Sequence, residues 1–97
     1  MQTEAEAVVE NHVSAQEGRL LRSATPVRTG GVTVFWSDTT GREVSGVEVV
    51  SRIYVFAWND VEYFFNCQEA VGSSNEIIRG CDRIFSTLRL GPPKGSA

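Results

Sequence analysis

Histidine, cysteine and long apolar runs are scarce in this chain of 97 residues, and each shortage excludes a class of protein. His12 is the only histidine, and no cysteine or carboxylate stands at ligand spacing around it. Structural zinc sites use about four ligands, so we expect no metal site and no cofactor. No apolar run approaches the ~20 residues that cross a bilayer, so we expect no transmembrane segment.

Positive charge is also in short supply, because nine Lys and Arg stand against twelve Asp and Glu. Nucleic-acid-binding domains are usually basic, so a net charge of −3 argues against that class. The start of the chain is acidic where a secretion signal is basic and then apolar. We therefore expect either a cytoplasmic chain or the mature part of a longer precursor.

The composition is that of one globular domain, with 41% hydrophobic residues. We expect a single α+β domain over residues 1–90 and a disordered tail over residues 91–97. The first element is a helix at about residues 3–16, with Thr3 and Glu6 at capping-box spacing. A strand at about residues 19–28 follows, and Pro26 predicts that it lies at a sheet edge.

The next strands alternate in hydrophobicity, which is typical of an antiparallel sheet. Gly30-Gly31 predicts a turn, residues 32–37 a strand, and residues 37–41 a loop. The longest strand spans about residues 43–58 with apolar residues on both faces, so we expect it to be central. Asn59-Asp60 predicts a tight hairpin into a strand over residues 61–67.

The last helix, at about residues 75–88, has the clearest apolar stripe, and Ser73 with Glu76 predicts its capping box. The resulting fold class is α+β: an N-terminal helix, a four-stranded antiparallel meander, and a C-terminal helix packed on the sheet.

Cys67 and Cys81 are the only cysteines, at the end of a strand and on the inward stripe of the next helix. A short loop joins these elements, so one interpretation is a disulfide, which favours an extracytoplasmic location. The other is two free buried thiols, which favour the cytoplasm.

No catalytic constellation stands out, so we expect no enzyme. His12 has a structural or surface role in this interpretation, and the carboxylates lie on solvated surfaces. Most aromatic side chains are predicted to lie in the core. A pocket or interface is the alternative for four residues: Trp36, Arg52, Tyr54 and Trp58.

One segment carries a resemblance to a known family. It is the strand over residues 49–56, the returning strand over residues 61–65, and a helix ending Ile84-Phe85-Ser86-Thr87-Leu88. This segment resembles the PsbP-like fold of photosystem extrinsic proteins, a Ran-binding import factor and bacterial secreted lipoproteins. The family's N-terminal hairpin has no counterpart here. The resemblance implies a non-catalytic accessory or binding domain, often extracytoplasmic in bacteria.

Two classes of function remain open from the sequence. The first is a binding module that acts through a sheet face or edge by protein–protein contact; apart from it, the chain could be a subunit fragment that dimerises through the Pro26 strand. The second is a small-ligand-binding or enzymatic domain of the NTF2-like cone type, with an aromatic pocket formed by Trp36, Tyr54 and Trp58.

Overall fold

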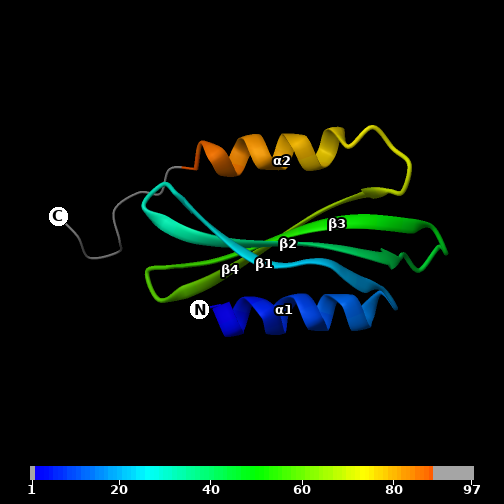
Figure 1. Cartoon of the computed structure of the whole chain (residues 1–97), viewed down its shortest axis with the longest axis horizontal. Helices are drawn as coiled ribbons and strands as arrows, with labels where there is room; N and C mark the ends of the chain where they lie inside the picture. Colours follow the sequence, from blue (N-terminus) through cyan, green and yellow to red (C-terminus); the bar gives the residue numbers. More distant parts are fainter. Residues whose placement is uncertain (1, 89–97) are drawn as a thin grey trace.

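A four-stranded antiparallel sheet lies between two helices, one on each of its faces (Figure 1). The computed structural model describes residues 2–88. In chain order the elements are α1 (Gln2–Ala15), β1 (Arg19–Thr29), β2 (Val32–Arg42), β3 (Glu48–Trp58), β4 (Val61–Ala70) and α2 (Glu76–Ser86). The predicted α+β class, the meander and the two terminal helices are confirmed. The predicted tail at residues 91–97 lies outside the described residues.

The strands follow each other in the order β1-β2-β3-β4, so β2 and β3 are interior and β1 and β4 are the edges. Both outer hairpins have two-residue turns with positive φ at both positions: 58° and 83° at Gly30 and Gly31, 53° and 62° at Asn59 and Asp60. Such turns match the twist of the strands that they join. Both predicted hairpins and the edge position of Pro26 are therefore confirmed.

The predicted loop at residues 37–41 is wrong, because β2 continues through it to Arg42. Ser37 pairs with Ile53, and Thr39 pairs with Ser51. Ser37 and Thr39 are 1% and 0% exposed, so pairing and burial override their turn propensity. The predicted strand start at residue 43 is also wrong, since residues 43–47 form the β2–β3 turn with Gly46 at φ 91°.

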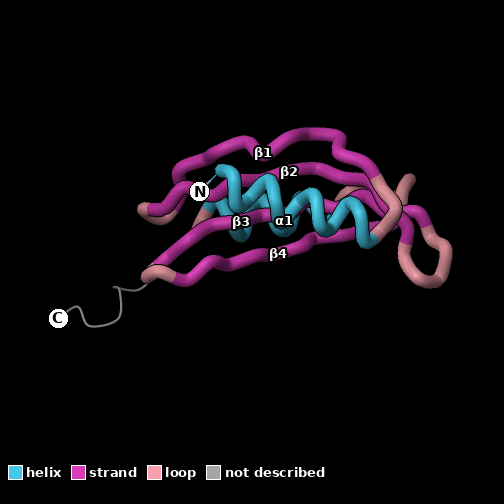
Figure 2. The backbone as a smooth tube through the Cα atoms, turned by 90° about the horizontal axis from the view of Figure 1, so that it is seen from below, coloured by secondary structure: helices cyan, strands magenta, loops and turns pink. Residues whose placement is uncertain are grey.

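One apolar core lies between α1 and the sheet, and Figure 2 shows α1 lying lengthwise over the sheet, roughly along the strands. Ala5 and Val9 of α1 pack against Phe35, Ile53 and Val55. The core confirms the predicted stripe of the first helix. The predicted Thr3 cap is wrong, because α1 already includes Gln2 and Thr3 lies inside it.

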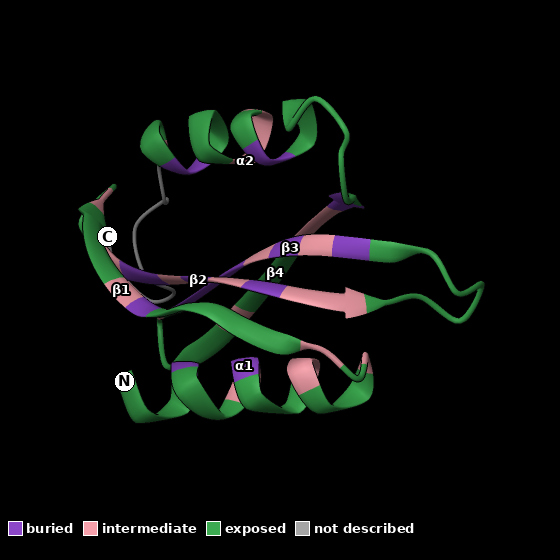
Figure 3. Cartoon of the chain, turned by 45° about the vertical axis from the view of Figure 1, so that its right-hand side comes forward, coloured by how far each residue is buried: buried purple, intermediate pink, exposed green. Residues whose placement is uncertain are grey.

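A second core lies on the other face, between α2 and the sheet. Val34, Tyr54 and Phe56 of the strands pack against Phe85 of α2 there. Odd residues of β3 thus face α1 and even residues face α2, so β3 is covered on both faces as predicted. Figure 3 shows the burial concentrated in β2 and β3, with β1 and β4 largely exposed.

The N-terminus of α2 is stabilised from β4. Asn75 occupies the N-cap position without a side-chain hydrogen bond, so the predicted Ser73–Glu76 capping box is wrong. Glu69 of β4 accepts hydrogen bonds from the Ser73 hydroxyl and, at 3.0 Å, from the Ile78 amide. A carboxylate at this position satisfies an early helix amide and complements the helix dipole.

Candidate functional site

The four residues predicted as a pocket or interface all lie on the α2 face of the sheet, but they do not form one site. Trp36 pairs directly with Tyr54 across β2 and β3, and Arg52 lies two residues before Tyr54. Trp58 lies at the far end of β3, beside the hairpin turn. The structure thus brings three of the four together and separates Trp58 from them.

Arg52 is held on both sides by carboxylates. Its guanidinium donates to Asp38 at 2.7 and 3.0 Å and to Asp82 of α2 at 2.6 Å. The guanidinium carbon also lies 4.3 Å from the centre of the Trp36 ring, at cation–π distance. The Asp38 hydrogen bonds raise the pKa of Arg52. Two carboxylates compensate this cation, so Arg52 joins α2 to the sheet and does not offer an unpaired charge to an acidic partner.

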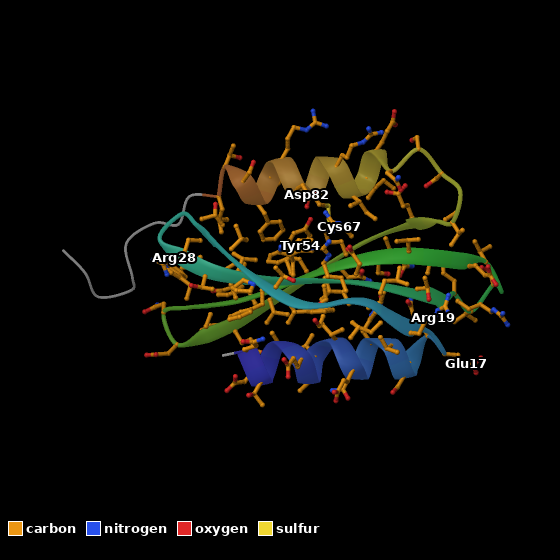
Figure 4. The ribbon with its side chains drawn as sticks, viewed as in Figure 1. Glu17, Arg19, Arg28, Tyr54, Cys67 and Asp82 are labelled. Carbon is orange, nitrogen blue, oxygen red and sulfur yellow. A yellow bond between two sulfur atoms is a disulfide. The ribbon has the colours of Figure 1, made fainter. Side chains whose placement is uncertain are left out.

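Tyr54 has the same structural role. Its hydroxyl donates to Asp82 at 2.5 Å, and its ring stacks on Phe85 with 4.0 Å between centroids. Burial raises the pKa of Tyr54, since the charged form would be poorly solvated there. Figure 4 shows Tyr54, Cys67 and Asp82 together between the sheet and α2. Tyr54 is 3% exposed, so it supports the core more than it lines a surface.

One cavity of about 310 Å³ on this face is lined by Asp38, Arg52 and Asp82. Two more open on this face, and they divide the predicted residues between them. One of about 240 Å³ lies beside Trp36, Arg52 and Tyr54, with Val27 of β1 on its far side. The other, of about 420 Å³, is lined by Trp58, Tyr63, Phe65 and Ile84. Its lining is almost entirely apolar and lacks the convergent polar groups that orient a small ligand.

Cys67 of β4 and Cys81 of α2 have their sulfurs at bonding distance, with 6.6 Å between the Cα atoms. The pair thus lies at disulfide distance, as the disulfide interpretation requires. The bond closes a loop of 14 residues. It fixes α2 to the edge strand beside the larger cavity.

His12 is part of the packing of α1. Its Nε2 lies 3.4 Å from the Ser51 hydroxyl, which also donates to Gln68 at 3.0 Å. Burial lowers the pKa of His12, which favours the neutral ring. Ser51 has no exposed surface, so a substrate cannot reach this hydroxyl without displacing α1.

No residues in the described range 2–88 bring three potential metal ligands together. None of the helices described is long and apolar enough to cross a membrane.

The two sheet edges differ sharply. β1 has Pro26, which lacks an N–H, and two irregular register steps, between Leu20 and Arg22 and between Arg22 and Thr25. Such features protect an edge from pairing with another strand. β4 pairs with β3 in unbroken register from Val61 to Ala70 and has no proline.

Within residues 2–88, the backbone groups of β4 that have no partner strand belong to its even residues. In a two-residue hairpin the pair that flanks the turn is hydrogen-bonded, here Trp58 with Val61, and every second pair follows. The hydrogen bond from the Val71 amide to the Glu48 carbonyl fits this alternation, because it joins another pair in the same series. The N–H and C=O groups of Glu62, Phe64 and Asn66 therefore point away from β3.

Each face of this edge carries one half-exposed phenylalanine, and on the α1 face it stands among the polar residues Glu62, Asn66 and Gln68. Phe64, on the α1 face, is 45% exposed, and Phe65, on the α2 face, is 46% exposed. The sequence predicted most aromatic side chains in the core and singled out neither Phe64 nor Phe65. One signal for their exposure is visible in the sequence. The last strand of a meander is an edge strand, and here it has aromatic residues at neighbouring positions that face opposite sides of the sheet.

Family models, curated proteins and solved structures were compared with the chain, and none matches it. The resemblance to the PsbP-like fold therefore stays a prediction.

Proposed function

We propose that this chain is a non-catalytic protein-contact domain that receives an extended partner segment along β4. The observation that carries the proposal is the free edge of β4, with outward backbone groups and the half-exposed Phe64 and Phe65. Strand addition needs both, because main-chain hydrogen bonds give affinity and alternate side chains give specificity. Glu62 is the only charge in residues 61–68, beside the polar Asn66 and Gln68, so the partner segment carries little charge and has apolar residues opposite Phe64 and Phe65.

The other surfaces support a binding role over a catalytic one. Arg52 and Asp82 compensate each other, and the Ser51 hydroxyl near His12 is buried. Perturbed groups that serve catalysis usually face an open cleft. The groups with the strongest interactions here instead attach the helices to the sheet.

The disulfide supports an extracytoplasmic place of action. Disulfides persist in oxidising compartments and are rare where glutathione keeps thiols reduced. The Cys67–Cys81 bond joins two elements of the same domain, as a structural bond does. Mass measurement of alkylated protein from its native host tests this: unmodified cysteines support the location, and two alkylated cysteines contradict it.

A second candidate is small-ligand binding in the cavity of about 420 Å³ beside Trp58 and Phe65. Its volume lies within the range of ligand pockets, and its walls are aromatic. A thermal-shift screen with planar aromatic fragments separates the two candidates. Strong, selective stabilisation that a Trp58→Ala variant loses favours the pocket, and a flat response favours the contact domain.

Selection of displayed random peptides against the whole domain tests strand addition directly. We expect enriched peptides to be extended and apolar and to slow hydrogen exchange at the amides of Glu62, Phe64 and Asn66. Glu62→Pro removes one outward N–H of β4 and should weaken binding by about tenfold, a loss of about 1.4 kcal/mol.

Arg28→Pro is the matched control for this change. Thr29 and Val61 flank the two hairpin turns, so Arg28 and Glu62 are each one residue further from their turn. Both point their N–H groups outward at a sheet edge. Peptides that bind both variants equally, or protection of β1 amides, would contradict the proposal.

A further inference from the structure

We infer that the segment received by β4 is β4 of a second copy of this chain, in antiparallel pairing around Phe64. The inference rests on the proposed function, because it names the partner of the same edge. It would join two four-stranded sheets into one eight-stranded sheet, with the two-fold axis passing between Phe64 and its symmetry mate.

The register follows from the side chains. With Phe64 on the axis, Phe64 meets Phe64 of the second copy on the α1 face, and Tyr63 meets Phe65 on the α2 face. Directly opposed aromatic pairs stabilise antiparallel strands. Tyr63 and Phe65 already contact Phe56, with 5.2 and 6.1 Å between ring centroids. The dimer therefore extends an aromatic cluster that exists in each chain.

Other registers centred between residues 62 and 66 match less well. An axis at Glu62 opposes two carboxylates, which is unfavourable for directly facing residues. An axis at Tyr63 places Phe64 against Glu62, and an axis at Phe65 places Phe64 against Asn66. An axis at Asn66 leaves Phe64 facing Gln68. Only the axis at Phe64 gives every aromatic of this segment an aromatic partner.

Charge does not oppose this pairing. With the axis at Phe64, each Glu62 faces Asn66 of the other copy, whose side-chain amide can donate to the carboxylate. Asp60 faces Gln68 at the outer end of the contact. No two like charges meet directly, so the edge is complementary to itself under two-fold symmetry.

The helices leave this half of β4 accessible. The first turns of α2 contact the other half of the strand, through Glu69 and the Cys67–Cys81 bond. The end of α2 reaches β1, where the Thr29 hydroxyl donates to the Phe85 carbonyl at 2.7 Å, and the Phe85 ring also contacts Phe65 edge-on with 5.5 Å between ring centroids, which leaves the outer side of Phe65 exposed. On the opposite face, α1 packs on β1, β2 and β3. Residues 61–66 therefore form the part of the edge that a second chain can approach.

Isotope-filtered NMR on a mixture of labelled and unlabelled chains, with the disulfide intact, tests the pairing without any substitution. Non-hydrogen-bonded pairs bring Cα atoms to about 4.5 Å. We expect an intermolecular Hα–Hα contact between Tyr63 and Phe65. Intermolecular contacts from β1, or from β4 in another register, would overturn the inference.

Sedimentation of the wild type over a range of concentrations is the companion measurement. We expect a reversible rise toward twice the mass of one chain, weakened about tenfold or more by Glu62→Pro and unchanged by Arg28→Pro. Amide spectra establish that each variant is folded. A wild type that stays monomeric at all concentrations overturns the second copy as partner. The peptide selection still reports on the proposed function in that case, so the two failures are distinguishable.

Discussion

β1 and β4 are both edges of the same sheet, both about ten residues long and both joined to it by a two-residue hairpin. They differ in what they present to another strand. β1 has Pro26 and two irregular steps, and its exposed Leu20 and Leu21 stand at one of these steps. Under the proposed function, exposed apolar side chains make a contact edge only where the backbone beside them is regular.

A second difference is the connection to the helices. β4 carries both Cys67, bonded to α2, and Glu69, which accepts a hydrogen bond from the Ile78 amide. β1 carries no cysteine, and its described link to α2 is the Thr29 hydroxyl. The edge that is free for a partner is therefore also the edge that holds α2 in place.

The largest expected effect comes from removing the Cys67–Cys81 bond. Cys67→Ser with Cys81→Ser should lower the free energy of unfolding by about 3 kcal/mol, since a loop of this size is no longer closed in the unfolded chain. Urea denaturation measures the change. Full stability in the double variant would mean that the packing of Ile78 and Phe85 alone holds α2 to β4.

The next largest effect is expected from a substitution in the β4 edge. Phe64→Lys places a charge in the middle of the contact and should weaken docking by about tenfold or more. The side chain is half exposed, so the free energy of unfolding should change by only about 0.5 kcal/mol. Val27→Lys on β1, also 45% exposed, is the matched control. Equal losses of self-association in both variants would remove the distinction between the edges.

Acidification provides a smaller test of the β4–α2 connection. The Ser73 hydrogen bond lowers the pKa of Glu69 from its ordinary value of 4.5. A lowered pKa in the folded state contributes stability above the ordinary value, which is lost as pH falls through the folded-state pKa. The stability difference between wild type and Glu69→Gln should therefore shrink on acidification, as measured by urea denaturation at several pH values. A difference that is constant with pH contradicts this role.

The smallest effect is expected from opening β1 at one position. Pro26→Thr restores a single outward N–H, while the irregular steps and the arginines of β1 remain. We expect self-association by sedimentation to stay at the wild-type level. New association through β1 in this variant would show that the proline alone protects that edge.

The sequence predicted the features that depend on local chemistry. Asn59-Asp60 and Gly30-Gly31 predicted both hairpins because these residues tolerate positive φ, and Pro26 predicted an edge because it lacks an N–H. These signals act within a few residues of the chain, so no knowledge of packing is needed to read them.

Features that depend on distant elements were missed. The strand at Ser37 and Thr39 depends on pairing with β3, and the cap of α2 comes from Glu69 on another element. The exposure of Phe64 and Phe65 depends on where the helices lie across the sheet. No local pattern contains this information, so the candidate site could be predicted only as an aromatic-rich face.

Hydrogen exchange of the Glu62 amide against the Arg28 amide, with and without a selected peptide, tests the central claim most directly. Both amides point outward, one residue beyond the pair that flanks each hairpin turn. The account predicts that bound peptide slows exchange at Glu62 and leaves Arg28 unchanged. Slower exchange at Arg28, or at neither amide despite binding, would contradict it.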